Sequence, residues 1–289
     1  LPAMRLVLAD SPHLSGQQRG EPLPYIGNTE DIPNTPFAKR VRIGGSVRPG
    51  RVAVLGYDPR VGTAVKLAGD AQVEHALESR YEQFLYHPPV FARAGEQVSA
   101  ANGQTEAALA LGALRQRRRE ITLETNQLDV APGVIFRIDG HPRADLNVPL
   151  LTVERRIEGT IHSEWDIDLH AIRASDGFRP ARRTAKPRVM GLQSAIVVGP
   201  GDEEIHTDSL GRVKVQFFWD RYGNGDPESS CWIRPSQPWA GSGYGLSFIP
   251  RVGHEVLVGF YEGDPDQPVI VGRGYHRGAQ PPDELPKKK

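Results

Sequence analysis

Apolar and polar residues alternate along residues 206–220, which read HTDSLGRVKVQFFWD. After a polar start that is typical of a turn, one side of the extended chain would hold four apolar residues, Val213, Val215, Phe217 and Trp219. The opposite side would hold Arg212, Lys214, Gln216 and Phe218. A repeat of two residues is typical of a strand with one buried face. The stretch could be the edge of an active site, a nucleic-acid-binding strand or one wall of a barrel, and in a barrel wall Arg212 and Lys214 would be free for contacts between subunits.

Short strands separated by glycine and proline are expected along two stretches of the chain. The second stretch has predicted strands at 194–198, 211–220, 230–235, 245–250, 254–263 and 267–273. This punctuation is typical of a small closed barrel. The first stretch has predicted strands at 51–55, 121–125, 133–138, 150–159 and 163–172. In the last of these, alternation places Glu164, Asp166 and Asp168 on one polar outer face.

Two segments carry the spacing of amphipathic helices. In residues 70–87, apolar residues recur every three or four positions until Pro88 and Pro89 end the pattern. In residues 105–121, Thr105 is positioned to cap the start of an alanine- and leucine-rich face. Arg117–Arg119 would lie on the last turn, where positive charge suits the helix dipole.

Composition narrows the classes of function. Of 289 residues, 35 are basic and 35 are acidic, so the formal net charge is zero, whereas a dedicated nucleic-acid binder usually carries a basic excess. The single cysteine, Cys231, excludes an internal disulfide framework and a cysteine-based zinc cluster. No apolar run approaches the roughly 20 residues that span a membrane. The chain is expected to be a packed protein that binds other proteins and no nucleic acid.

Several residue groups resemble catalytic or ligand-binding motifs without meeting their spacing. His206, Asp208 and Ser209 are three residue types of a hydrolase triad, but triad members converge from separate elements. His254 and Glu255 lack the second histidine of a metalloprotease helix, because Val258 stands in its place. The remaining histidines are scattered. We therefore expect no enzyme activity, no catalytic residue, no metal site and no cofactor in this chain.

A basic segment separates the two β-rich stretches. Residues 172–188 contain six basic residues and one acidic residue, together with Pro180 and Pro187. Acidic residues gather instead in two loops of the second stretch. Opposite charge between such surfaces favours association of copies. The suspected contacts between subunits are Arg179, Arg182 and Arg183 on the basic segment and Glu203, Glu204, Asp264 and Asp266 on the acidic loops.

Three ordered motifs in the second stretch carry a specific resemblance. They are HTDxxGRVKVQFxWD, SSCWIRxSQPWAG and FIPRxGxEVxVxFxEGDPDxP, where x marks a position left open. Together they resemble the oligonucleotide-binding-fold module of VgrG proteins, the spikes of type VI secretion systems, which are related to the hub and needle proteins of contractile phage tails. Upstream, MRLVLADSP and residues 128–159 resemble the hub region of that family.

The resemblance implies a mainly β fold with a few helices, in the α+β class. A tube-protein-like β-barrel hub region, N-terminally incomplete, would occupy residues 1–171, and a basic linker residues 172–189. An oligonucleotide-binding-fold β-barrel would occupy residues 190–275, and residues 276–289 would connect toward a needle. The C-terminal β-helical needle of the family is expected to be absent from this chain.

The resemblance also implies partners and a place of action. A homotrimer would cap the hexameric, Hcp-like tube protein, contact baseplate and wedge proteins, carry a PAAR-type tip cap and effectors, and cross a target membrane transiently. It would assemble in the cytoplasm of a Gram-negative-type bacterium and then be injected into the target cell. Two alternatives stay open: a contractile phage baseplate hub or extracellular injection spike, and an evolved spike with a hydrolytic effector domain beyond this chain.

Overall fold

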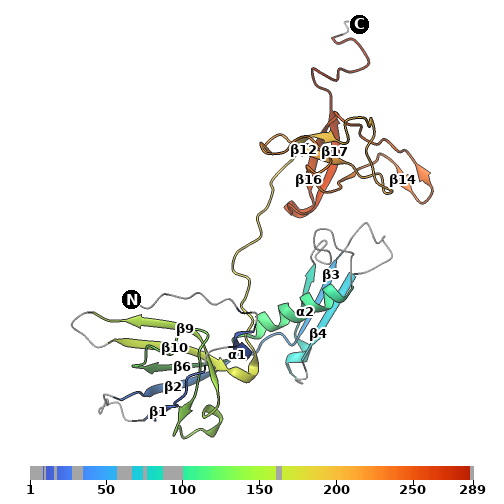
Figure 1. The fold of residues 1–289 in the computed structure, drawn as a ribbon. Helices are drawn as coiled ribbons and strands as arrows, with labels where there is room; N and C mark the ends of the chain where they lie inside the picture. Colours follow the sequence, from blue (N-terminus) through green and yellow to red (C-terminus); the bar gives the residue numbers. More distant parts are fainter. Residues whose placement is uncertain are drawn as a thin grey trace. The chain divides into compact units, whose positions relative to one another are not determined.

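The chain divides into two compact units. The computed structural model describes residues 9, 11–15, 18–27, 35–56, 67–73, 77–86, 100–160 and 165–286, with the backbone alone for 67–72 and 100. The N-terminal unit holds the described residues up to Arg183, and the C-terminal unit holds those from Thr184 onward. The division falls within the predicted linker, and each unit is built mainly of strands (Figure 1).

A seven-stranded sheet forms the body of the N-terminal unit. Its order is β7 (Ile135–Phe136), β9 (Leu150–Glu158), β10 (Asp166–Arg173), β6 (Arg119–Thr125), β2 (Ala38–Gly45), β1 (Leu23–Ile26) and β8 (Ile138–Asp139). The two end strands, β7 and β8, are separated only by Arg137, whose carbonyl accepts a hydrogen bond from the backbone N–H of Leu23 at 2.8 Å. The two ends of the sheet therefore meet in one continuous segment, and the sheet closes as a barrel.

Alternation along the strands fills this barrel. In β10, Ile167 and Leu169 are buried while Asp166 and Asp168 are exposed, which confirms the polar outer face expected for these two aspartates; Glu164 lies outside the described residues. The inward-facing residues form one core cluster with Leu23, Ile121 and Phe136. Burying such side chains contributes about 1.5–3 kcal/mol each, so the closed sheet accounts for much of the stability of this unit.

A smaller lobe of the N-terminal unit packs one helix on three strands. Its sheet has the order β4 (Leu67–Gln72), β3 (Arg51–Gly56) and β5 (Glu82–Tyr86), and α2 (Ala100–Arg115) lies along it (Figure 1). Val52 and Val54 of β3 are buried against Ala107 and Leu111 of α2. Next to β3, a Cβ at Gly50 would collide with backbone atoms of Glu78 and Ser79, so glycine permits this close approach. A 3-10 turn, η1 (Glu78–Arg80), precedes β5.

The predicted helix at residues 70–87 was wrong. This segment contains the end of β4, the turn η1 and β5, and both strands pair with β3. Leu77, Tyr81 and Phe84, three residues of the expected apolar face, are exposed, and Leu85 packs instead on the helix–sheet core. Pairing with β3 satisfies the backbone of both strands at once, and this non-local gain outweighs a helical spacing.

The second predicted helix is present, but it begins and ends at other residues than the predicted 105–121. α2 begins at Ala100, and the Thr105 hydroxyl donates to the carbonyl of Ala101 at 3.1 Å, so Thr105 is an interior residue and no cap. The helix ends at Arg115, and Arg119 already begins β6. The prediction that Arg117–Arg119 occupy the last turn was therefore wrong.

Short elements complete the N-terminal unit, and an irregular segment continues the chain into the C-terminal unit. These short elements are α1 (Pro12–Ser15), η2 (Ala144–Leu146) and η3 (Ala174–Asp176). From Gly177 to Leu192 the chain forms no helix or strand. The described residues thus contain seventeen strands and only two α-helices, which confirms a mainly β fold with few helices.

The C-terminal unit is a five-stranded barrel. Its sheet order is β12 (Lys214–Phe217), β11 (Gln193–Val198), β16 (Glu255–Phe260), β17 (Pro268–Gly274) and β13 (Arg234–Pro235). Just before the two end strands, Val213 and Ile233 exchange two backbone hydrogen bonds of 2.9 and 2.7 Å. This pair closes the sheet around Val197, Val215 and Val256, as expected for a small closed barrel.

Two predicted strands of this unit are largely replaced by other structure. Residues 245–250 were expected to form a strand, but only Gly245 does, in the hairpin β14 (Ala240–Gly241) and β15 (Tyr244–Gly245). Of residues 230–235, only Arg234 and Pro235 form a strand. The turn η4 (Tyr261–Gly263) joins β16 to the last acidic loop.

Candidate functional site

The turn before β12 uses the polar residues that resembled a hydrolase triad. The Asp208 carboxylate accepts the backbone N–H groups of Leu210 and Arg212 at 3.0 and 2.9 Å and binds the Arg212 guanidinium at 2.6 Å. The His206 ring lies 2.8 Å from Glu203 and does not contact Asp208. Gly211 adopts a positive φ of 71°, which completes the turn. The geometry makes Asp208 a turn-stabilising residue, as its position beside a turn suggested.

The charged side of the predicted strand is occupied within the chain. Arg212 pairs with Asp208, and Lys214 lies 3.7 Å from Glu228 and 5.2 Å above the Trp232 ring. The prediction that Arg212 and Lys214 are free for contacts between subunits was therefore wrong.

The prediction that four apolar residues share the buried side of this strand is correct for three of them. Val213 and Val215 are fully buried, and Phe217 packs against the barrel core. Trp219 is 67% exposed instead, because β12 ends at Phe217 and the chain turns there. Its indole N–H donates to the side chain of Gln193 at 2.9 Å, and its ring stacks on Phe217.

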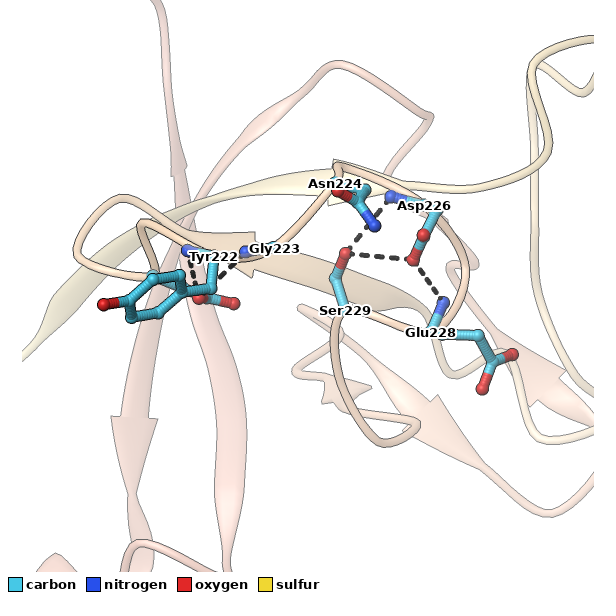
Figure 2. A pocket seen from close by; sticks show the side chains of 7 residues that line it. Tyr222, Gly223, Asn224, Asp226, Glu228 and Ser229 are labelled. Carbon is cyan, nitrogen blue, oxygen red and sulfur yellow. Dashed lines mark hydrogen bonds between the residues drawn. The ribbon is translucent and has the colours of Figure 1, made fainter.

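A shallow polar depression of about 310 Å³ lies in the loop after β12 (Figure 2). The Asp220 carboxylate accepts the backbone N–H groups of Tyr222 and Gly223, and the Asp226 carboxylate accepts that of Glu228 at 2.9 Å. Ser229 bonds to Asp226 as well. These groups satisfy one another and hold the loop in shape, so the depression offers few free donors or acceptors to a ligand.

The described residues hold neither a metal-binding cluster nor a helix that could span a membrane. Within the described ranges, no group of three or more histidine, cysteine, aspartate or glutamate side chains could hold a metal ion. No described helix has the length and apolar character needed to cross a bilayer.

The basic residues suspected of subunit contacts lie in the irregular segment after β10. Arg182 is exposed and pairs with Glu106 of α2 at 3.1 Å. Arg179 is half-buried, and its side chain passes next to Gly112 of the same helix. Arg183 is exposed. The structure thus joins Arg179 and Arg182 to the N-terminal unit of their own chain.

The acidic residues suspected of subunit contacts each have a partner in their own unit. Glu203 meets His206, and Glu204 meets Arg251. Asp264 and Asp266 both bind the ammonium group of Lys186, at 2.6 and 2.7 Å. The backbone N–H of Val189 also donates to the carbonyl of Gly263 at 2.8 Å, which fastens the end of the basic segment to the last acidic loop.

The sequence analysis did not predict that Lys186 pairs with Asp264 and Asp266, although the opposite charges of the two segments indicated a contact. A basic segment and an acidic loop were recognised as complementary, but the contact was assigned to two copies. Burial alone would lower the pKa of Lys186, yet the hydrogen bonds and charges of Asp264 and Asp266 outweigh it and raise that pKa above its ordinary value. The ammonium group therefore stays charged, and the contact forms within the C-terminal unit.

A protruding apolar hairpin was also missed. Residues 236–249, which we call the finger, contain β14 and β15 and extend away from the barrel (Figure 1). Four large apolar side chains on it are between 45% and 64% exposed: Trp239, Tyr244, Leu246 and Phe248. Its signal was a stretch from Pro235 to Pro250 without one charged residue. Contiguous exposed apolar side chains of this kind mark an interaction surface.

A second apolar surface, which we call the shelf, comprises Leu192, Trp219 and Val271. All three side chains are exposed. Leu192 and Val271 lie side by side over Gly259, where each would contact an added Cβ. Trp219 is tied by its hydrogen bond to Gln193, the neighbour of Leu192.

Two known families match successive parts of the chain. Residues 3–162 match the phage tail baseplate hub (GPD). Residues 195–275 match the type VI secretion system/phage-baseplate injector OB domain, where OB denotes the oligonucleotide-binding fold. A solved structure of the E. coli c3393 protein, described as a type VI secretion component with similarity to the T4 bacteriophage tail proteins gp27 and gp5, shares the fold. Its TM-score is 0.50 at 18% identity, over 90% of this chain and 50% of that chain.

Curated relatives extend the similarity over almost the whole chain. The spike protein VgrG1a of Pseudomonas aeruginosa PAO1 is 38% identical over 251 residues, which cover 83% of this chain and 38% of the relative. VgrG2b of the same bacterium is 36% identical over 303 residues, covering 98% of this chain and 28% of the relative. The chain thus spans about a third of the length of the curated relatives that it matches. It belongs to the VgrG family of type VI secretion system spike proteins.

Proposed function

We propose that this chain acts as a structural part of a type VI secretion spike, which forms a homotrimer and caps the secretion tube. The observation that carries this proposal is the succession of two closed barrels, a hub barrel and an OB barrel, in a member of the VgrG family. Closed sheets leave no free edge strands, which suits a body that is driven through a membrane under load. In this role the chain contributes rigidity and binding surfaces rather than catalysis.

The proposed partners follow from this role. The trimer would contact the hexameric, Hcp-like tube protein and the baseplate, and it would carry a PAAR-type tip cap and effectors toward a target cell. Assembly would take place in the bacterial cytoplasm before injection. A phage baseplate hub is the second candidate, favoured by the family match of residues 3–162 and by the relation of the c3393 protein to T4 tail proteins.

Solution mass tests the trimer directly. Light scattering or sedimentation of the purified chain should give three times the 31.8 kDa chain mass. Addition of the tube protein from the same secretion gene cluster should then produce a larger complex. A mass of one chain at every concentration would contradict the homotrimer. A trimer that does not bind this tube protein, but does bind a phage tail tube protein, would favour the phage hub.

Charge contacts between copies remain part of the proposal. Arg179, Arg182 and Arg183 would face the acidic loops with Glu203, Glu204, Asp264 and Asp266, although most of these residues also have partners in their own chain. The sharpest single probe is Arg183→Glu, because Arg183 is exposed on the basic segment. We expect it to weaken trimer formation by about 2–5-fold, since rim charges contribute up to about 1 kcal/mol.

The control for this prediction is a reversal elsewhere on the surface. Arg277→Glu changes the same charge on an exposed residue of the C-terminal tail. Sedimentation at low and high salt should show the loss for Arg183→Glu mainly at low salt, where screening is weak. Equal trimer stability of the two variants at low salt would remove Arg183 from the set of proposed contacts.

A further inference from the structure

We propose that four basic side chains at one end of the OB barrel form a binding site for an oxyanion, which is a carboxylate or a phosphate group. The four are Arg251, His254, Arg273 and His276, and we call them the cationic cluster. They come from the turn before β16, from β17 and from the chain that follows it. This inference goes beyond the proposed function and does not depend on the homotrimer.

Strand pairing brings the four residues of the cationic cluster together. His254 directly precedes β16, and Arg273 lies opposite Val256 on β17, so both belong to the same end of this strand pair. His276 follows shortly after Arg273 in the chain. The charges of Arg273, Arg251 and His276 all act on the His254 ring, which places the four groups close to one another in space.

The turn before β16 fixes the direction of the His254 ring. The backbone N–H of His254 donates to the carbonyl of Arg251 at 3.0 Å, and Gly253 within this turn adopts a φ of 87°. The backbone N–H of Arg251 in return donates to Nδ1 of His254 at 3.4 Å. Because Nδ1 is an acceptor, the neutral ring carries its hydrogen on Nε2, and this N–H can donate to another group.

His276 holds a buried donor that has no acceptor in the described part of the chain. Its Nδ1 accepts the backbone N–H of Gly278 at 3.1 Å, so the neutral ring carries its hydrogen on Nε2. This Nε2 is buried and has no hydrogen-bond partner among the described residues. A buried donor without an acceptor costs free energy, and an anionic oxygen that enters beside it would relieve that cost.

Arg273 is the main permanent cation of the cluster. Its guanidinium donates to the backbone carbonyl of Phe248, a neutral acceptor, and no carboxylate of the described residues pairs with it. Partial burial lowers the pKa of Arg273 below its ordinary value of 12.5, although the group stays charged. The planar guanidinium has further N–H groups, whose geometry suits a carboxylate or a phosphate.

Acidic compensation within the cluster is incomplete. Glu204 pairs with Arg251, and alternation along β16 directs Glu255 to the other face of the strand. Burial and the charges of Arg273 and Arg251 hold the pKa of His254 below its ordinary value of 6.5, against an opposing effect of Glu204. The Glu204–Arg251 pair shows that this cluster binds a carboxylate. An oxyanion from outside would supply the countercharge that Arg273 lacks.

Titrations of the full chain with acetate and with inorganic phosphate test this site. They are followed by NMR of isotope-labelled histidine rings, in which His254→Gln and His276→Gln each remove one resonance and so assign it. Both resonances should shift saturably with at least one anion, and the pKa of His254 should rise as the bound anion offsets the surrounding cations. Sodium chloride at the same ionic strength should give no saturable shift. The anion that binds more tightly distinguishes a carboxylate source from a phosphate source.

A single substitution tests whether the anion binds at the cluster. Arg273→Gln should weaken the anion affinity on the order of tenfold, because one charge-assisted donor is lost. Arg221→Gln is the matched control, since Arg221 is exposed on the loop after β12 and lies over the Tyr222 ring. It removes the same charge and should leave the affinity unchanged. Unchanged resonances of the other histidines in both variants show that the fold is intact.

Three results would overturn the inference. The first is the absence of a saturable shift with either anion. The second is an equal affinity of Arg273→Gln and the unaltered chain, because the anion would then bind outside the cluster. The third is an equal loss of affinity in Arg221→Gln, which would show a response to net charge alone. None of these results bears on the mass of the chain, so the proposed spike trimer is tested separately.

Discussion

Replacing Glu78 with glutamine is expected to lower the free energy of unfolding of the helix–sheet lobe by about 3–5 kcal/mol. Glu78 is only 4% exposed, and its carboxylate lies 2.7 Å from Arg115 at the end of α2 and 3.1 Å from Arg118. It also accepts the backbone N–H of Arg48. Removal of its charge leaves the guanidinium of Arg115 buried without its counterion, which costs more than the pair itself contributes.

Hydrogen exchange measures this effect where it arises. Peptides from β3 and α2 should exchange faster in Glu78→Gln, because this lobe opens at a lower free energy. Glu158→Gln is the matched control, since Glu158 pairs with Arg156 and both side chains are exposed. Exposed pairs contribute about 0–1 kcal/mol, so this control should exchange like the unaltered chain. Equal protection of α2 in both variants would show that Glu78 does not hold the lobe together.

The same carboxylate predicts a dependence of stability on pH. Burial alone would raise the pKa of Glu78, but the hydrogen bond from Arg115 and the charges of Arg115 and Arg118 outweigh it and hold the pKa below its ordinary value of 4.5. Because the folded-state pKa is the lower one, this contribution is complete above about pH 4.5 and is lost as the pH falls through the folded-state pKa. The stability difference between the unaltered chain and Glu78→Gln should therefore shrink as the pH falls below 4.5. A constant difference from pH 7 to pH 3 in urea titrations would contradict this assignment.

Asp208→Ala is expected to destabilise the OB barrel by about 2–4 kcal/mol, the sum of several charge-assisted hydrogen bonds. The carboxylate accepts two backbone N–H groups and the Arg212 side chain within one turn. Alanine leaves these donors unsatisfied and also frees the guanidinium of Arg212. The turn sets the start of β12, and the Val213–Ile233 pair that closes the barrel follows at once.

Denaturant unfolding followed by tryptophan fluorescence reports mainly on this unit, because three of the four tryptophans, Trp219, Trp232 and Trp239, lie in it. Asp208→Asn should lose less stability than alanine, because its amide oxygen still accepts backbone hydrogen bonds. Asp202→Ala provides the control on an exposed residue of the preceding loop and should change stability by less than about 0.5 kcal/mol. A loss for Asp202→Ala as large as that for Asp208→Ala would mean that the effect is not specific to the turn.

The residues that carried the family resemblance are the ones that the barrel needs. In the motif HTDxxGRVKV, Asp208 and Arg212 hold the turn, Gly211 supplies its positive φ, and Val213 and Val215 fill the core. Each role depends on a few neighbouring residues and on strand alternation. Such local requirements can be read from a sequence, which is why the OB barrel and the outer face of β10 were predicted correctly.

Other features depended on contacts between distant segments. The helical spacing of residues 70–87 was outweighed by pairing of β4 and β5 with β3, and the buried ion pairs of Glu78 join a 3-10 turn to a helix end about 37 residues later. The spacing of apolar residues along the sequence predicted neither the burial of Glu78 nor the exposure of Trp219. Spacing reports which residues could share a face, but it does not report which other segment covers that face.

The sequence by itself determined the two-module β fold, the membership in the VgrG family and the charges on the basic segment and acidic loops. Only the tertiary structure decided that Lys186 meets Asp264 and Asp266 within one chain, that Arg212 and Lys214 are already paired, and that the finger stands uncovered. Alternation and turn chemistry act over a few residues and can be read along the chain. Partner choice among charges and the covering of an apolar surface depend on distances in space, which only the folded chain defines.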